Sequence, residues 1–327
     1  MASAINASSP DQVYFCSCGT EANNAAIWGV VMHYNTTPHV ISSTIEHPAI
    51  LNYLAFAAGR GWLEFDLAPV DRQGIVDPDS VVSLLRPTTR LVSIMHANNE
   101  MGAVQPIQAI VQAIRNADPL VLVHTDAAQS FGKVTFDVQA MGVDMATIVG
   151  HKIGAPKGTA ALYVRHGVEL VPMLHGGGQE RGWRGGTENV MLAAALGAAA
   201  EVARHGLDER RARLERLREM LVTELQDKLD VVVHGPVDAQ HRLPSVLCCT
   251  IMGVHGGTLL ARVRHQLAAS SGAACHGSGV ASGMLQALGV DPEVAAYGTL
   301  RLSVGGATTE EDVLEGVKTL IECCVVD

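Results

Sequence analysis

The chain has 327 residues, of which 48% are hydrophobic, and single cores stop growing near about 250–300 residues, so two domains are expected. Its formal net charge of −10 excludes the broad basic surface that binding to nucleic acid or to an anionic membrane requires. We therefore expect a small, anionic ligand as the partner, and neither nucleic acid nor a membrane.

Short apolar runs alternate with helix-like segments through the first half of the chain. Six of these runs have the length and composition of strands: Val13–Cys16, Val40–Ser43, Leu63–Leu67, Leu91–Ala97, Val121–Asp126 and Ala146–Val149. Asp77 followed by Pro78 predicts a capped helix through Leu85. This alternation predicts an α/β fold, with a mainly parallel central sheet that carries helices on both faces.

The pattern changes near Val190, where a long charged helical stretch begins. Its leucines recur at three- and four-residue intervals, and its charges are typical of the solvated face of a connecting helix. Later strands, the last one followed by a helix, are predicted in three segments: Val231–His234, Ser245–Met252 and Leu300–Cys323. We place a boundary near residue 205, between a large domain over 1–205 and a smaller α+β domain over 206–327.

Cysteine usage and the first residues indicate a cytosolic protein. The seven cysteines form no CxxC pair and have no zinc-like spacing to histidines, so we expect reduced thiols and no metal site. The first residues, MASAINASSPDQ, resemble neither a secretory signal nor a transit peptide. The apolar stretch Val190–Ala203 is too short to cross a membrane.

Lys152 is the first candidate for chemistry, because it follows the apolar strand MATIVG and precedes the loop IGAPKG. An isolated lysine there is most often a surface residue. Asp126, however, ends another apolar strand, at the sheet edge where open α/β sheets bind ligands. Such an aspartate can cap a helix, but an enzyme that uses pyridoxal phosphate (PLP) needs it to keep the pyridine nitrogen protonated. Gln129 could then donate to the ring phenolate.

Three further segments would bring polar groups to the same edge. Gly19 and Thr20 begin a helix, where free N–H groups can bind a phosphate, although the segment also suits an ordinary helix start. His47 and Asn99 each follow a strand. Either one alone can be structural, His47 as a buried hydrogen-bonding residue and Asn99 as a turn former.

Eight segments, in order, carry a family resemblance over essentially the whole chain: GTEANN, EHPA, HANNEMG, HTDAAQS, GHKIGAPKG, GGGQERGWRGGTEN, SSGAACHGSG and LRLSVGGATTEED. The set resembles the cysteine desulfurase and selenocysteine lyase family, the class V branch of fold-type I PLP-dependent enzymes. The resemblance implies the aminotransferase-like type I fold, with PLP as the cofactor.

The resemblance also implies roles for single residues. Lys152 matches the lysine that holds PLP in a Schiff base and removes the substrate's α-proton. The other cofactor positions are Asp126 at the pyridine nitrogen, Gln129 and Asn99 at the phenolic oxygen, His47 stacked on the ring as a proton relay, and Gly19, Thr20 and His151 at the phosphate. Thr187 matches a threonine that reaches the phosphate of a neighbouring subunit, which implies a homodimer.

Two further positions concern the substrate. Arg301 matches the arginine that binds the substrate α-carboxylate, near Asn99, which suits its planar guanidinium. Cys275 matches the reactive cysteine, and its glycine-rich flanks indicate an exposed thiol. The other six cysteines are interpreted as structural.

The sequence favours selenocysteine lyase, which converts selenocysteine to alanine and selenide. Val149, Gln179 and the GAACH text around Cys275 support this choice, whereas the preceding SSG favours the alternative. That alternative is a cysteine desulfurase, in which Cys275 becomes a persulfide and passes its sulfur to an acceptor protein.

Family members begin with further residues, including a strand with the pattern D-N-x-A-T-T. This chain begins inside the helix that precedes VYFCSCGTEANN. A truncated, non-catalytic isoform or binding partner is therefore a second alternative. We expect PLP binding to survive in the chain as given and turnover to be low.

Overall fold

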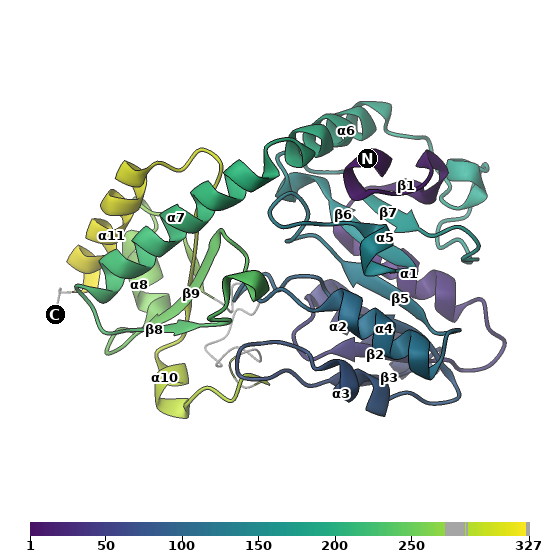
Figure 1. The fold of residues 1–327 in the computed structure, drawn as a ribbon, viewed down its shortest axis with the longest axis horizontal. Helices are drawn as coiled ribbons and strands as arrows, with labels where there is room; N and C mark the ends of the chain where they lie inside the picture. The colour runs from purple at the N-terminus through teal and green to yellow at the C-terminus, as the bar shows by residue number, and fades with distance from the viewer. Residues whose placement is uncertain (272–284, 286, 325–327) are drawn as a thin grey trace. The chain divides into compact units, whose positions relative to one another are not determined.

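The computed structural model describes residues 1–271, 285 and 287–324, which form two compact units (Figure 1). Unit 1 comprises Met1–Pro69, Val76–Ala97 and Gln105–Leu207. Unit 2 comprises Val70–Ile75, Asn98–Val104 and Asp208–Asp327. Two short segments from the first half of the chain thus belong with the C-terminal unit.

Unit 1 is built on a seven-stranded sheet in the order β1-β7-β6-β5-β4-β2-β3. Its strands are β1 Val13–Cys16, β2 His39–Ser43, β3 Glu64–Ala68, β4 Thr89–Ser93, β5 Leu122–Asp126, β6 Met145–Val149 and β7 Ala160–Val164. The pairs that β7 makes with β1 and β6 are antiparallel and the other four are parallel, so the predicted mainly parallel sheet is confirmed. Every residue of β2, β6 and β7 is buried, as expected for strands covered on both faces.

Helices flank this sheet. They are α1 Gly19–Val31, α2 Pro48–Gly59, α3 Pro78–Ser83, α4 Ile107–Ala117, α5 Val138–Met141 and α6 Val190–Arg204, with 3-10 turns η1 Ala2–Ile5, η2 Pro10–Gln12, η3 Gly150–Lys152 and η4 Glu180–Gly182. Asp77 caps α3 by accepting the Asp79 N–H at 3.2 Å, as its sequence predicts. Helix α4 buries Ile107, Ile110 and Ile114 at helical spacing.

Unit 2 has a four-stranded antiparallel sheet in the order β10-β11-β9-β8. Its elements are α7 Leu207–Gln226, β8 Val231–His234, η5 Ala239–His241, β9 Val246–Ile251, α8 Gly256–Val263, β10 Ser270–Ser271, α10 Pro292–Ala296, β11 Leu300–Ser303 and α11 Glu310–Cys324. Leucines of α7 pack with β9, β11 and α11 in one core. In the described part of the chain no single helix is long and apolar enough to span a membrane; α6 and α7 meet that test only as a pair, by length and composition.

A buried polar line crosses the centre of the large sheet. Ser93 Oγ on β4 lies 2.9 Å from His124 Nδ1 on β5, and His124 Nε2 lies 3.0 Å from Thr147 Oγ1 on β6. Burial lowers the pKa of His124 to about 3, so its imidazole is neutral. These contacts help to fix the register of the three strands near Asp126, the last residue of β5.

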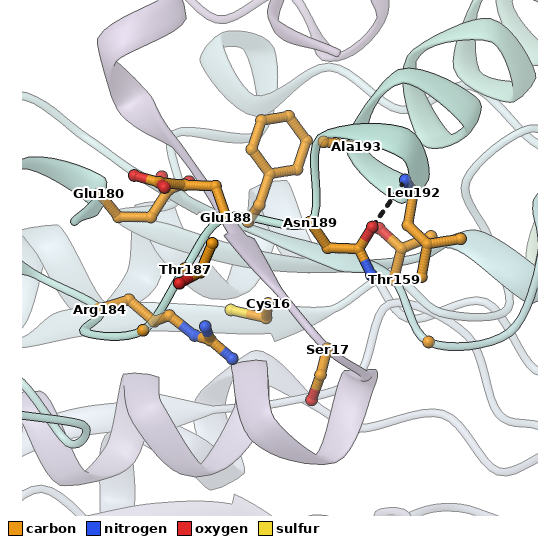
Figure 2. Close-up of a pocket in the computed structure, with 13 residues that line it drawn as sticks. Cys16, Ser17, Thr159, Glu180, Arg184, Thr187, Glu188, Asn189, Leu192 and Ala193 are labelled. Carbon is orange, nitrogen blue, oxygen red and sulfur yellow. Dashed lines mark hydrogen bonds between the residues drawn. The ribbon is translucent and has the colours of Figure 1, made fainter.

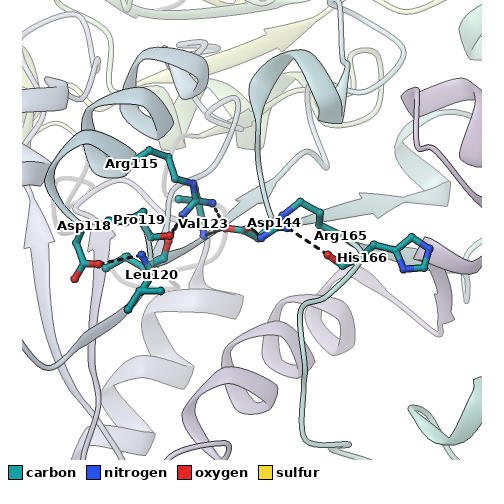
Figure 3. A network of polar contacts seen from close by, with 9 residues as sticks. Arg115, Asp118, Pro119, Leu120, Val123, Asp144, Arg165 and His166 are labelled. Atoms are coloured by element: carbon teal, nitrogen blue, oxygen red, sulfur yellow. Dashed lines mark hydrogen bonds and ion pairs between the residues drawn. The ribbon is translucent and has the colours of Figure 1, made fainter.

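Asp144, just before β6, is the centre of a buried ion network (Figure 3). Its fully buried carboxylate binds Arg115 of α4, accepts the Arg165 Nε–H at 2.7 Å and accepts the Val123 N–H at 2.7 Å. Arg115 also donates to the Val121 carbonyl. The network therefore ties α4, β5 and β6 to the end of β7.

We predict that Asp144→Asn lowers the free energy of unfolding by about 3 kcal/mol, because it removes a fully buried carboxylate that binds the partly buried Arg115 and the exposed Arg165. Denaturant unfolding measures this loss. The control is Asp227→Asn at an exposed position, which should change stability by less than about 0.5 kcal/mol. Equal effects of the two substitutions would contradict the assigned role of the network.

Candidate active site

Asp126 is a buried carboxylate at the carboxyl end of β5, with only 6% of its surface exposed. Its Oδ2 accepts the Asn23 Nδ2–H at 2.6 Å, and its Oδ1 accepts the Ala128 N–H at 2.8 Å. Burial raises the pKa of Asp126, while these hydrogen bonds and the nearby charges of His47 and Lys152 act against that rise. The position therefore suits a carboxylate with a cationic partner.

The start of α1 lies against the end of β6. A Cβ atom added to Gly19 would lie 2.6 Å from Val149 Cγ2, so only glycine permits this close approach. Val149 immediately precedes the turn Gly150–Lys152. The first turn of α1, where Thr20 lies and where backbone N–H groups have no intrahelical acceptor, is thus held beside the turn that carries Lys152.

His47 is fixed as the N-cap of α2. Its Nδ1 accepts the Ala49 N–H at 3.0 Å, so the neutral ring carries its proton on Nε2. Burial and the charge of Lys152 lower the pKa of His47, and Asp126 opposes that shift. His47, Asp126 and Lys152 therefore interact electrostatically, as predicted for residues at one edge of the sheet.

His151 and Lys152 end the η3 turn and are both exposed. The pKa of His151 is lowered by burial and by the positive charges of Lys152 and Lys157. These residues form a basic group on the loop after β6, next to the start of α1. That arrangement is compatible with the predicted phosphate and Schiff-base roles.

Gln129, three residues after Asp126, has a defined amide orientation. The ammonium of Lys133 lies 3.1 Å from Gln129 Oε1. Because an ammonium only donates hydrogen bonds, the amide oxygen must face Lys133 and the amide NH₂ points elsewhere. Gln129 can therefore act as the predicted donor.

Arg301 and Asn99 lie together within unit 2. Arg301 Nη1 donates to the Asn99 carbonyl at 2.9 Å. The preceding Asn98 shapes this turn, since its Oδ1 accepts the N–H groups of Glu100 at 2.8 Å and Met101 at 3.0 Å. The first asparagine of the pair thus forms the turn, and the second contacts the arginine.

Thr187 lines a cavity of about 260 Å³ in unit 1 (Figure 2), and neither Asp126, His47 nor Lys152 is among the residues that line it. Ser17, Cys16 and Arg184 also line it, and Arg184 Nε binds Glu21 Oε1 of α1 at 2.8 Å. In Figure 2 the Thr187 and Arg184 side chains border the same space. Within this chain Thr187 is therefore not part of the Asp126 group, so its predicted role concerns a second subunit.

The cysteines differ in exposure. Cys16, Cys248 and Cys249 are buried, and burial raises the pKa of each thiol. Cys323 and Cys324 are partly buried, whereas Cys18 is exposed at the N-cap of α1. Cys275 lies outside the described residues. No group of histidine, cysteine and acidic side chains suited to a metal ion occurs among the residues that the structure describes.

Three residues near the site were not predicted to be functional: Asn23, Glu46 and Lys133. Asn23 is a polar residue on the buried face of the alanine-rich helix α1. A polar side chain among buried alanines was the feature of the sequence that could have indicated its role. Glu46 is an acidic residue next to His47, and it is unusual in being buried. Nothing in the sequence indicates the contact of Lys133 with Gln129, apart from their four-residue spacing.

The unit 1 residues fit a phosphorylated pyridine cofactor. Asp126 offers a buried carboxylate for a protonated ring nitrogen, and Gln129 offers an oriented amide donor. Gly19 leaves the start of α1 free of a side chain on the β6 side. Lys152 would hold PLP covalently, and the first turn of α1 with His151 would hold its phosphate.

Comparisons with known proteins agree with this fit. The aminotransferase class-V family model matches residues 1–315. Cysteine desulfurase IscS of Dictyoglomus turgidum is 39% identical over 329 residues, which cover 98% of this chain and 82% of that protein.

Two solved structures extend the comparison. A NifS-like protein superposes with a TM-score of 0.91 at 33% identity, and the match covers 98% of this chain and 84% of that protein's chain. SspA in complex with cysteine has a TM-score of 0.78 at 32% identity, with coverages of 93% and 84%. The predicted type I fold and PLP dependence are thereby confirmed, and the chain belongs to the class-V aminotransferase family of PLP-dependent enzymes.

Proposed function

We propose that this chain is a cysteine desulfurase, which converts L-cysteine to L-alanine and transfers the sulfur to Cys275. The observation that carries the proposal is the group of Asp126, His47 and Lys152 in a chain 39% identical to a cysteine desulfurase. The SspA structure with bound cysteine supports the same substrate class.

PLP, when bound, withdraws electrons from the α-carbon of the amino acid, which acidifies the α-proton and weakens the bond from Cβ to sulfur. Asp126 would supply the negative charge for the protonated ring nitrogen. Arg301 binds the substrate carboxylate through its planar guanidinium. Lys152 Nζ, as the neutral amine, accepts the α-proton, and the exposed position of its side chain leaves it accessible to a bound amino acid.

His47 works from Nε2, because the Ala49 N–H occupies Nδ1. The neutral ring therefore presents an N–H donor while its orientation is fixed by the helix cap. Protonation at Nδ1 would break the cap, and this agrees with the lowered pKa of His47. The helix cap therefore favours the neutral imidazole, whose Nε2–H can donate a hydrogen bond, over the doubly protonated imidazolium.

Sulfur transfer from cysteine to Cys275 needs no external oxidant, because the electrons of the broken carbon–sulfur bond remain on the carbon skeleton. The Cys275 thiolate attacks the substrate sulfur, the bond between Cβ and sulfur breaks, and a bond between two sulfur atoms forms. The carbon skeleton takes up protons at Cβ and Cα and leaves as alanine. Cys275 leaves the step as a persulfide, which a thiol of an acceptor protein can attack in turn.

The sequence preference for selenocysteine lyase has structural explanations that do not involve selenium. Gln179 Oε1 accepts the Gly186 N–H at 3.0 Å and so braces its own loop. Val149 packs against Gly19. The relatives in the comparison that are named for their activity, such as those of Dictyoglomus turgidum, Clostridium botulinum and Methanosarcina thermophila, are cysteine desulfurases. We therefore rank the lyase second.

Purified, PLP-saturated protein should be supplied with cysteine or selenocysteine in separate reactions, with alanine as the common product. The proposal predicts alanine from cysteine together with sulfide when a reductant is present. Alanine from selenocysteine alone would support the lyase. Alanine from neither substrate, with PLP bound, would support a non-catalytic binding protein.

We also propose that the protein acts as a homodimer. Thr187 lines a cavity whose lining does not include Asp126, and the helix that follows, α6, exposes Val190, Met191 and Val202 to 71%, 82% and 68%. Apolar side chains this exposed are typical of a surface that another protein covers. A second copy placed there would bring its phosphate to Thr187.

Dilution should then release PLP, because a cofactor that is bound by two subunits dissociates as the subunits separate. Analytical ultracentrifugation with absorbance detection of PLP follows both events in one experiment. A PLP-saturated monomer at nanomolar concentration would refute the shared site.

A further inference from the structure

Glu46 joins the ends of two central strands beneath the segment that carries His47. Its Oε1 accepts the Ser43 Oγ–H at 2.7 Å, at the end of β2, and the Met95 N–H at 2.8 Å, just beyond β4. The next residue is His47, the cap of α2. Glu46 therefore anchors the turn between β2 and α2 to the neighbouring strand.

The second carboxyl oxygen of Glu46 is buried and has no hydrogen-bond partner. The residue as a whole is 5% exposed. An ionised carboxylate there would lack both water and a compensating cation, which is one of the most costly arrangements in a protein interior. A carboxylic acid avoids most of that cost.

The ionisable groups around Glu46 do not supply a cation. Asp126, at the end of β5, has the same sign of charge, and it adds to burial in raising the pKa of Glu46 to about 8. The pKa values of His47, the next residue in the chain, and of His96, which follows Met95, are lowered, mainly by burial. Both imidazoles are therefore neutral at pH 7.

We propose that Glu46 is a positioning residue of the cofactor site that acts as an uncharged carboxylic acid. It locks the turn that carries His47 onto β4, and it leaves Asp126 as the negative charge of this buried region. The inference rests on the proposed roles of His47 and Asp126, and it adds a residue that touches neither substrate nor cofactor.

The first test measures the protonation state of the Glu46 carboxyl group directly. Infrared spectra of the PLP-loaded wild type and of Glu46→Gln are subtracted, so that cofactor bands cancel. A carboxylic-acid carbonyl band, absent from the variant, should persist at pH 7 and disappear as the pH rises through about 8. A band that is already missing at pH 7 would show an ionised Glu46 and overturn the proposal.

The second test reads positioning. Glu46→Gln keeps a neutral amide with an acceptor oxygen, so PLP affinity and the pH dependence of the cofactor absorbance should stay within about twofold. Glu46→Leu removes both hydrogen bonds and should weaken PLP binding by about tenfold. If Glu46→Leu does not fold, Ser43→Ala, which removes one bond, should weaken binding by a smaller factor.

Opposite results would refute the positioning role. Wild-type PLP affinity in both Glu46→Leu and Ser43→Ala would show that the anchor does not position the site. A loss in Glu46→Gln as large as that in Glu46→Leu would show that the negative charge is needed. Both tests remain readable if the protein does not turn over cysteine, so failure of this inference is separable from failure of the proposed function.

Discussion

Lys152→Ala is expected to lose turnover by a factor on the order of 10²–10⁴ or more, since it removes both the covalent hold on PLP and the base for the α-proton. Borohydride should no longer trap PLP on the chain. Noncovalent binding should persist in part, because Asp126 and the first turn of α1 are unchanged. Absorbance spectra and the mass of the borohydride-treated protein measure both effects.

The matched control is Lys157→Ala, which removes an exposed lysine from the same loop. It should retain borohydride-trapped PLP and turnover within a few-fold of the wild type. Covalent PLP in the Lys152→Ala variant would place the linkage at another lysine. Equal losses in both variants would indicate that the loop as a whole, rather than one amine, determines activity.

Cys275→Ala should abolish alanine formation from cysteine while leaving selenocysteine turnover substantial. A selenol is far more acidic than a thiol, so selenium can leave as an anion without nucleophilic attack, whereas sulfur transfer requires the Cys275 thiolate. We expect cysteine turnover to fall by at least about 10²-fold. Alanine release with each substrate, under anaerobic conditions, measures the difference.

Cys323→Ala serves as the control, because Cys323 is a partly buried thiol on α11. It should leave both reactions near wild-type rates. Undiminished cysteine turnover in Cys275→Ala would contradict the persulfide step. Equal loss of both substrates would instead indicate that Cys275 acts on a step that the two reactions share.

The sequence predicted the large sheet well, because buried parallel strands form apolar runs such as that of β6. It missed β7, which lies between a glycine-containing loop and a charged segment and pairs antiparallel with both β1 and β6. The allocation of Val70–Ile75 and Asn98–Val104 to unit 2 was also not predicted. Strand pairing and packing between segments that are far apart in the sequence produce no local pattern of residues from which they could be predicted.

The candidate site was predictable where chemistry requires a particular residue type at a strand end, as for Asp126 and His47. The contacts that hold those residues were not. Asn23 lies 103 positions from Asp126 in sequence, and Glu46 receives a hydrogen bond from Met95, 49 positions away. The same limit applies to substrate choice: in the sequence the identities of Val149 and Gln179 favoured the lyase, whereas both side chains make local contacts in the fold.

The most direct measurement is the mass of the PLP-loaded protein after one anaerobic turnover with cysteine, followed by peptide mapping. The cysteine desulfurase account predicts one added sulfur atom on the peptide that contains Cys275, together with one equivalent of alanine. It also predicts that neither product forms in the Lys152→Ala variant. Alanine without any sulfur on Cys275, or sulfur on another cysteine, would contradict it.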